Sequence, residues 1–274
     1  MLVRVIPNKT KIAKLLGLSR QSLYYEPIKE EKDKFDKKII RKVMKNNPAY
    51  GHKRIALELK WGKNKTKRLM KKFNLKPARR RIQKQPTKID DLNFNQIDYF
   101  NIYHQYQELN QIDEFNILWR GDFTYIKYQN KFIYKATIIE VCNREVIRIA
   151  LSNYHDSNLV TIALENALVN HNSSLFFHSD QGSEYRSEKY SILLNKFNIT
   201  QSFSDKSSPW QNGQQESFFS HFKLEFGDFN KFNSKGKLFA QIYQMVYYYN
   251  NERVHTALKM SLISYRKKLL KIKK

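Results

Sequence analysis

The sequence contains a single cysteine, Cys142, among 274 residues. One cysteine excludes an intramolecular disulfide and a cysteine-rich zinc knuckle, and we expect it to be a buried core thiol. No stretch approaches the roughly 18 apolar residues that a membrane span needs, and residues 1–11 lack the apolar segment of a signal peptide. Acidic residues are also few: the chain has 25 of them and 50 lysines and arginines. We therefore expect a cytoplasmic protein with no membrane partner.

The excess positive charge is concentrated near the N-terminus. Residues 1–90 contain 28 lysines and arginines against 7 acidic residues, a net charge of +21, whereas residues 91–265 contain 16 against 18, a net charge of −2. Solubility alone needs only a few net charges. A merely solvated surface is the alternative, but this separation favours a nucleic-acid-binding front part joined to a near-neutral body.

A first small helical unit is predicted at the start of this front part. Between Thr10 and Tyr25, apolar residues at helical spacing precede Gly17, which breaks a helix, and Ser19, which can cap the next one. This pattern predicts a helix-turn-helix within residues 1–30. An ordinary pair of helices produces the same pattern, so that alternative stays open.

A second helix-turn-helix is predicted over residues 36–77. Apolar residues at helical spacing indicate one helix before a break at residues 48–51. Two further helices, His52–Lys60 and Lys65–Phe73, flank a turn at a Trp-Gly pair. The last of these helices interleaves apolar and basic residues, which is typical of a helix with one core face and one phosphate-binding face.

A different composition begins near residue 110 and predicts an α/β domain over residues 110–266, between a basic linker (78–109) and a basic tail (267–274). Aromatic and β-branched segments predict strands, and segments of helical periodicity alternate with them. The expected strands are 117–128, 131–141, 145–152, 175–178 and 200–203, and the expected helices are 159–169, 187–197, 214–226 and 238–249. This order indicates a mixed sheet flanked by helices.

Three acidic residues lie at distinctive places in this order. Asp122 falls inside the first strand among apolar neighbours, where an unpaired charge is costly. Asp180 directly follows an apolar strand, at the end where α/β proteins place ligands, and Glu216 lies early in a helix. Singly, these residues are also compatible with an edge-strand charge, a turn aspartate and an ordinary first-turn glutamate. Because buried carboxylates repel one another unless a cation neutralises them, a cluster of three indicates a divalent ion with oxygen ligands, with Mg²⁺ the natural choice.

The residues around these acids form three blocks: WRGDFTYI at 119–126, HSDQGSEY at 178–185 and NGQQESFF at 212–219. These blocks resemble the signature blocks of bacterial insertion-sequence transposases of the D,D,35,E type, which have a retroviral-integrase-like core. The spacing agrees, since 35 residues separate Asp180 from Glu216. Lys223 stands where the family carries a basic residue.

Two further blocks, YGHKRI at 50–55 and YNNERVH at 249–255, resemble family motifs before and at the end of this core. The chain departs from the family pattern at Gln211-Asn212-Gly213, where Asp-Asn-Ala is usual, and at Leu262, where proline is common. Neither change affects one of the three acids.

The resemblance implies an RNase H-like integrase core with a mixed five-stranded sheet, preceded by small all-α helix-turn-helix domains. It also implies a DNA transposase, a metal-dependent polynucleotidyl transferase with endonuclease and strand-transfer activity at the ends of an insertion sequence. Asp122, Asp180 and Glu216 would be catalytic and would hold two Mg²⁺ ions, for which Mn²⁺ can substitute.

The resemblance further implies double-stranded DNA as partner, both as terminal inverted repeats and as target. The expected DNA contacts are basic residues of the second helical unit and one beside the acids: Lys53, Arg54, Lys65, Lys67, Arg68 and Lys223. Joining two ends argues for a homo-oligomer on DNA. The chain resembles a second-reading-frame product, which is fused to or paired with a first-frame product in many relatives. A solvated surface lysine is the alternative for Lys223.

Two other functions fit the same residues. One is a metal-dependent nuclease of this fold class that cuts DNA without joining it. The other is a non-catalytic DNA-binding regulator, in which helix-turn-helix units precede an inert body.

Overall fold

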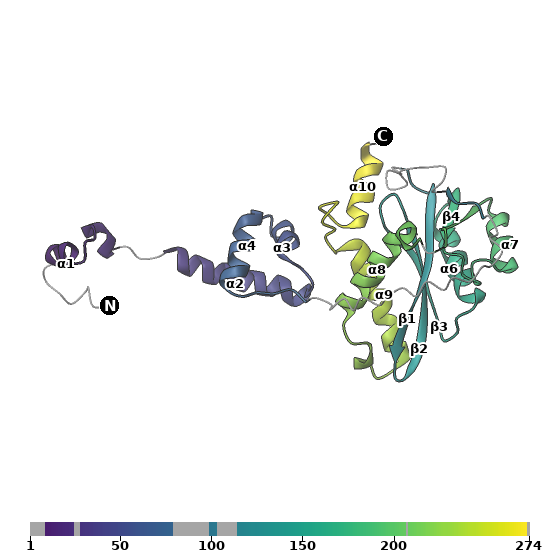
Figure 1. Ribbon diagram of the computed structural model, residues 1–274, viewed down its shortest axis with the longest axis horizontal. Coiled ribbons are helices and arrows are strands. Elements are labelled where there is room, and N and C mark those ends of the chain that lie inside the picture. The colour runs from purple at the N-terminus through teal and green to yellow at the C-terminus, as the bar shows by residue number, and fades with distance from the viewer. Residues whose placement is uncertain (1–8, 25–27, 79–98, 103–113, 207, 273–274) are drawn as a thin grey trace. The chain divides into compact units, whose positions relative to one another are not determined.

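The structure, a computed structural model, describes residues 9–24, 28–78, 99–102, 114–206 and 208–272. The chain divides into two compact units, one of residues 1–56 and 61–77 and one of residues 57–60 and 78–274. Both are drawn in Figure 1. Within the described ranges, no helix combines the length and the apolar character that crossing a membrane requires.

The first predicted helical pair is shorter than expected. Helix α1 (Lys9–Leu15) ends before Gly17, whose φ of +64° is a left-handed conformation that glycine adopts without strain. Ser19 accepts a hydrogen bond from the backbone N–H of Ser22 at 3.2 Å, as a cap does. The segment it opens is the short 3₁₀ helix η2 (Arg20–Tyr24), so the prediction of a second α-helix here is wrong. Leu15, Leu16 and Leu18, which precede this segment, are exposed and supply no packed face to support a longer helix.

The three helices predicted for the second helix-turn-helix are confirmed. They are α2 (Ile28–Asn46), α3 (His52–Glu58) and α4 (Lys63–Lys72), and α2 begins earlier than residue 36. Apolar side chains at helical spacing are buried on all three helices: Ile40, Ile55, Ala56, Leu69 and Met70.

The larger compact unit, which contains residues 78–274, is built on one five-stranded sheet in the order β3-β2-β1-β4-β5. The pairs β1–β2 and β2–β3 are antiparallel, while β1–β4 and β4–β5 are parallel. The predicted mixed sheet is therefore confirmed, and each strand agrees with its prediction to within one residue: β1 (Leu118–Tyr128), β2 (Lys131–Glu140), β3 (Val146–Ser152), β4 (Phe176–Ser179) and β5 (Thr200–Phe203). Gln129 and Asn130 both have positive φ, 45° and 62°, and form the tight turn between β1 and β2.

Helices cover both faces of the sheet (Figure 1). One face packs on α6 (Ser157–Asn170) and α7 (Glu188–Lys196), and the other packs on α8 (Gly213–Phe226), α9 (Lys235–Asn251) and α10 (Leu262–Ile272). Because successive side chains of a strand point to opposite faces, neighbouring residues of β2 enter different cores. Ile138 joins the α6 side and Ile139 joins the α8 side.

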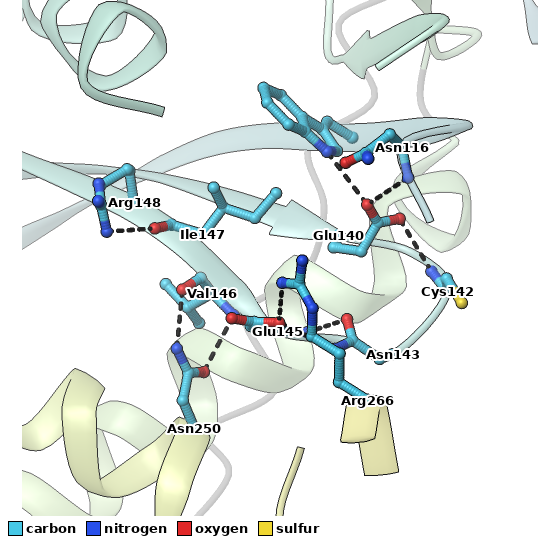
Figure 2. Close-up of polar contacts among 11 residues, drawn as sticks. Asn116, Glu140, Cys142, Asn143, Glu145, Val146, Ile147, Arg148, Asn250 and Arg266 are labelled. Carbon is cyan, nitrogen blue, oxygen red and sulfur yellow. Dashed lines mark hydrogen bonds and ion pairs between the residues drawn. The ribbon is translucent and has the colours of Figure 1, made fainter. Parts of the chain in front are cut away.

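Both edge strands carry additional polar contacts. At β5, the N–H of Phe203 donates to the carbonyl of Phe100 at 2.9 Å, and the N–H of Ile102 donates to a serine hydroxyl of the strand. At β3, the side chain of Asn250 accepts from the N–H of Val146 at 3.1 Å and donates to its carbonyl at 2.8 Å (Figure 2). These contacts occupy backbone groups that would otherwise offer a template for further strands.

Three further predictions about this unit need correction: the linker, the tail and the position of Cys142. Residues 99–102 were predicted as linker but pack against β5, while most of the predicted linker, like residues 1–8, lies outside the described residues. The predicted tail is not a separate segment up to residue 272, because α10 extends that far and Arg266 contacts the carboxylate of Glu145 at 2.9 Å (Figure 2). Cys142 is half-buried in a turn after β2, not in the core.

Candidate active site

Asp122 lies within β1, and Asp180 is the first residue after β4, the strand that runs parallel to β1. Strands β1 and β4 pair in register up to Arg120 and His178, and each aspartate lies two residues further along the chain. Residues two apart in a strand share a face. Asp122 therefore lies on the face of the sheet that carries Ile126, which is the face covered by α8, and Asp180 is close enough for its charge to act on Asp122.

A glycine allows the two strands to approach closely beneath this site. A Cβ atom on Gly121 would lie 2.4 Å from the ring of Phe177, so any larger residue would push β4 away. Beside it, His178 is fully buried and its Nδ1 lies 2.9 Å from a serine hydroxyl of β5. Burial, together with the positive charge of Arg120, lowers the pKa of His178 to about 3. The ring is thus a neutral packing and hydrogen-bonding group.

The electrostatics of the site show that its carboxyls influence one another. Burial raises the pKa of Asp122 to about 8, and the charges of Asp180 and Glu216 add to this shift, whereas a 2.7 Å hydrogen bond from the N–H of Phe123 opposes it. Burial also raises the pKa of Asp180. An ionised set of these carboxylates is therefore unfavourable without a neutralising cation.

Glu216 lies in the first turn of α8, which is anchored to the sheet by its neighbour Gln215. The Gln215 side chain is fully buried, and its amide donates to the carbonyls of Arg120 at 2.7 Å and Thr137 at 3.0 Å. Thr137 is the cross-strand partner of Asp122. This neutral amide therefore holds the first turn of α8 against the same strand pair that carries Asp122, while the side chain of Glu216 stays exposed.

A fourth acidic residue, Glu184, approaches Asp180 from the loop after β4. A Cβ on Gly182 would lie 2.9 Å from a Glu184 carboxylate oxygen and 3.0 Å from one of Asp180, so glycine leaves room for both. The other oxygen of Glu184 lies 3.2 Å from Nε2 of His155. The His155 ring in turn packs against Phe123, with 4.2 Å between ring centroids. His155 thus links the residue that follows Asp122 to the loop that follows Asp180.

The structure brings Asp122 and Asp180 together and places Glu216 within electrostatic range of Asp122. Among the described residues, no three acidic, histidine or cysteine side chains are placed closely enough to hold one metal ion. Three contributors were missed by the sequence reasoning. Gln215 and Glu184 were visible as polar residues inside the blocks around the acids, whereas nothing in the sequence marked His155, which comes from a different loop.

Two lysines lie on the α8 side of this site. Nζ of Lys223, two turns beyond Glu216, lies 4.9 Å from the ring centroid of Tyr125 on β1. Lys135 of β2 is fully buried, and its Nζ lies 3.5 Å from the ring centroid of Phe222 and 4.3 Å from that of Phe218. Burial lowers its pKa well below the usual range, and Lys223 adds to this effect.

The predicted DNA contacts on α3 and α4, in the N-terminal helical unit (α2–α4), differ in their surroundings. Lys65 and Arg68 form ion pairs with acidic residues of α2, at 2.7 and 2.6 Å. The guanidinium of Arg54 lies 5.6 Å from the ring centroid of Tyr50. Lys53 and Lys67 are exposed.

The block near the end of the core has a structural role. Arg253 is 1% exposed, and its guanidinium donates to both carboxylate oxygens of Glu225 on α8 at 2.9 Å. His255 lies 3.3 Å from the same guanidinium and packs edge-on against Tyr249. Together with the contact of Asn250 to β3, these interactions attach the end of α9 to both α8 and the sheet.

An integrase core domain family model matches residues 113–209, and a second integrase core domain model matches residues 198–261. The transposase for insertion sequence element IS904 of Lactococcus lactis is 30% identical over 146 residues, which are 52% of this chain and 58% of that protein. An uncharacterized transposase-like protein of Haemophilus influenzae is 30% identical over 153 residues, which are 55% of this chain and 71% of that protein. The chain thus spans little more than half the length of the Lactococcus relative.

Among solved structures, a chain of the simian T-cell lymphotropic virus intasome, in complex with PP2A regulatory subunit B56 gamma, has a similar fold. The TM-score is 0.50 at 16% sequence identity, and the match covers 55% of this chain and 54% of that chain. The predicted fold of an integrase core is therefore confirmed.

Proposed function

Since this chain belongs to the insertion-sequence transposases with an integrase catalytic core, we propose that it cleaves the ends of an insertion sequence and transfers the new strands into target DNA. The observation that supports this most strongly is the electrostatics of Asp122: burial raises its pKa to about 8, and the charges of Asp180 and Glu216 add to the rise. Neighbouring carboxylates repel one another, and a bound cation would stabilise their ionised forms.

The donor set fits divalent magnesium. Asp122, Asp180 and Glu216 offer only oxygen ligands, which Mg²⁺ and Mn²⁺ prefer, and the raised pKa of Asp122 marks a carboxyl whose ionised form needs a positive partner. These three residues would hold two ions, and Glu216, exposed in the first turn of α8, would complete the set. Bound Mg²⁺ would supply Lewis acidity that activates water or a 3′-hydroxyl and neutralises charge at the scissile phosphate.

The remaining roles belong to residues of the chain. Gln215 orients Glu216 by fixing the first turn of α8, and Lys223 contacts a DNA phosphate beside the acids. His155 and Glu184 position the loop that carries Asp180. In this mechanism no side chain acts as nucleophile, so no covalent protein–DNA intermediate forms, and the rate depends on alignment and charge neutralisation.

Partners and assembly follow from the chemistry of joining. The helical unit would bind the terminal inverted repeats, the core would bind both ends and target, and two ends require at least a dimer. A first-frame product, fused or separate, would complete the active form. Such a protein would act in the cytoplasm at the nucleoid.

The test uses the full chain, duplex oligonucleotides that carry the inverted repeats flanking its gene, and MgCl₂. We expect Asp122→Asn, Asp180→Asn and Glu216→Gln to bind these ends normally but to lose cleavage and strand transfer by about 1,000-fold or more, as the loss of several kcal/mol of transition-state stabilisation requires. Glu188→Gln, which removes an exposed acid of α7, is the matched control and retains both activities.

Two results would contradict the proposal. Release of cut ends without any joined product identifies a nuclease. Activity that stays unchanged in Asp122→Asn identifies a DNA-binding regulator whose core is inert.

A further inference from the structure

Helix α4 presents three different faces to its surroundings. With 100° between successive residues of an α-helix, Thr66, Leu69 and Met70 lie on the buried face. A second face carries Lys65, Arg68 and Lys72, and a third carries Lys63, Lys67 and Lys71 at four-residue spacing. The two basic faces are equal in charge, so composition does not distinguish them.

The second face is occupied by contacts within the unit. Asp33 of α2, 2% exposed, accepts two hydrogen bonds from the guanidinium of Arg68 at 2.6 and 2.8 Å and one from Lys72 at 2.8 Å. These partners hold the pKa of Asp33 well below its usual range. Lys65 pairs with Asp36 at 2.7 Å, and its Nζ lies 3.7 Å from the ring centroid of Trp61. Three cations of α4 thus neutralise two buried acids and attach α4 to α2.

The third face shows no such contacts among the residues whose placement is described. Lys63, Lys67 and Lys71 are exposed and form no ion pair within the part of the chain that the structure describes. Helix α3 adds Lys53 and His52 to this side. Lys67, Lys53 and Lys63 all lie close enough to His52 to lower its pKa, after the larger effect of burial. Lysines from two helices therefore converge on one point and repel one another unless an anion lies between them.

We propose that Lys53, Lys63, Lys67 and Lys71 form the surface by which this unit binds the phosphate backbone of double-stranded DNA, and that Lys65 and Arg68 stabilise the fold without contacting DNA. This inference rests on the proposed function and deepens it. It also revises the contacts expected from the sequence, which did not distinguish the two faces. Lysines at four-residue spacing on one face of a helix can follow a row of backbone phosphates, which fix orientation on the duplex without reading bases.

The test compares two triple variants of the full chain that remove equal charge from the same helix. Lys63→Gln/Lys67→Gln/Lys71→Gln is expected to retain the melting temperature. Its plot of log binding constant against log salt should be shallower by about 2.7, because each lost phosphate contact removes about 0.9 from the slope. Lys65→Gln/Arg68→Gln/Lys72→Gln should change the slope by less than about 1 and should lower the melting temperature, because Asp33 and Asp36 lose their partners.

The result that overturns the proposal is an equal change of slope in both variants, or a larger change in the second. If the second variant does not fold, Lys67→Gln and Lys65→Gln are compared singly. Then Lys67→Gln alone should reduce the slope by about 0.9, and a loss confined to Lys65→Gln contradicts the inference.

A second readout follows His52. Bound phosphate neutralises the lysines around its ring, so DNA should raise the pKa of His52, measured by NMR titration of the ring protons. An unchanged His52 pKa in the DNA complex counts against the surface. Cleavage assays separate this inference from the proposed function: the slope contrast can hold where Mg²⁺-dependent cleavage fails, and cleavage can occur where the contrast is absent.

Discussion

The helical unit and the core of this protein treat their buried acids in opposite ways. In the helical unit, Asp33 and Asp36 each have cationic partners within 2.8 Å. At the candidate site of the core, the charges that act on Asp122 are those of two other acids, Asp180 and Glu216. A buried cation does lie nearby, but Lys135 contacts phenylalanine rings instead of these acids.

This difference separates charges that build the fold from charges that are kept for a ligand. An acid neutralised inside the protein stabilises the packing around it, whereas an acid left beside another acid costs stability until a cation binds. Away from the site, the core also uses internal ion pairs, such as Arg253 with Glu225. At the candidate site, in contrast, burial raises the pKa of Asp122 and the charge of Asp180 adds to this rise.

The largest expected effect is a gain of stability on removing one of these acids. The folded pKa of Asp122, about 8, lies above its ordinary value of 3.8, so its contribution to stability is present below pH 3.8 and is lost as the pH rises to 8. Asp122→Asn avoids this loss. Without divalent ions, the variant should be more stable than the wild type by about 2–5 kcal/mol at pH 8 and equally stable at pH 4, measured by denaturant unfolding.

Two controls sharpen this prediction. Mg²⁺ should raise the stability of the wild type but not that of Asp122→Asn, because only the former gains a ligand that binds the folded state. Asp33→Asn should have the opposite sign and lower the melting temperature at neutral pH, since Arg68 and Lys72 stabilise the ionised form of Asp33. Destabilisation by Asp122→Asn would remove the contrast between the two regions.

A smaller effect is expected at Gln215, which holds α8 with a neutral amide where the helical unit uses ion pairs. Gln215→Leu keeps the volume but loses both hydrogen bonds to β1 and β2. Cleavage of element ends should fall about 10- to 100-fold, which corresponds to about 1.4–2.8 kcal/mol of lost alignment. Gln215→Leu should also need a higher Mg²⁺ concentration for cleavage than the wild type does.

The matched control is Gln244→Leu, the same substitution at an exposed position of α9, which should leave cleavage unchanged. Gln215→Asn, which shortens the side chain but keeps the amide, should recover part of the rate. Equal rates for Gln215→Leu and the wild type would show that the amide does not position Glu216.

The smallest effect concerns Lys135. Because burial lowers its folded pKa below the ordinary 10.5, its cost to stability is present at neutral pH and disappears as the pH approaches 10.5. Lys135→Met, which keeps the contact with the phenylalanines, should raise the stability by about 1 kcal/mol at pH 7 and by less at pH 10. Lys131→Met, on an exposed part of the same strand, should change little, and a loss of stability in Lys135→Met would mean that its contact with the aromatic rings outweighs desolvation.

Much of this protein follows from local sequence signals. Hydrophobic periodicity located each strand of the described sheet to within a residue, because this signal acts between residues close in the chain. The residue blocks around the three acids, together with their spacing, indicated the family and allowed a site to be proposed. The sequence did not reveal helix α10 (Leu262–Ile272). The basic residues from position 267 onward suggested a separate tail, although they continue the helix in which Arg266 reaches back to Glu145.

Only the tertiary structure decided which polar groups serve the fold and which remain available to a ligand. Lys65 and Lys67 are alike in sequence, yet the first pairs with Asp36 across two helices and the second is exposed. His155 and Glu184 meet from separate loops 29 positions apart. Such assignments depend on contacts between distant segments, and a charge has the same local pattern whether its partner lies within the protein or outside it.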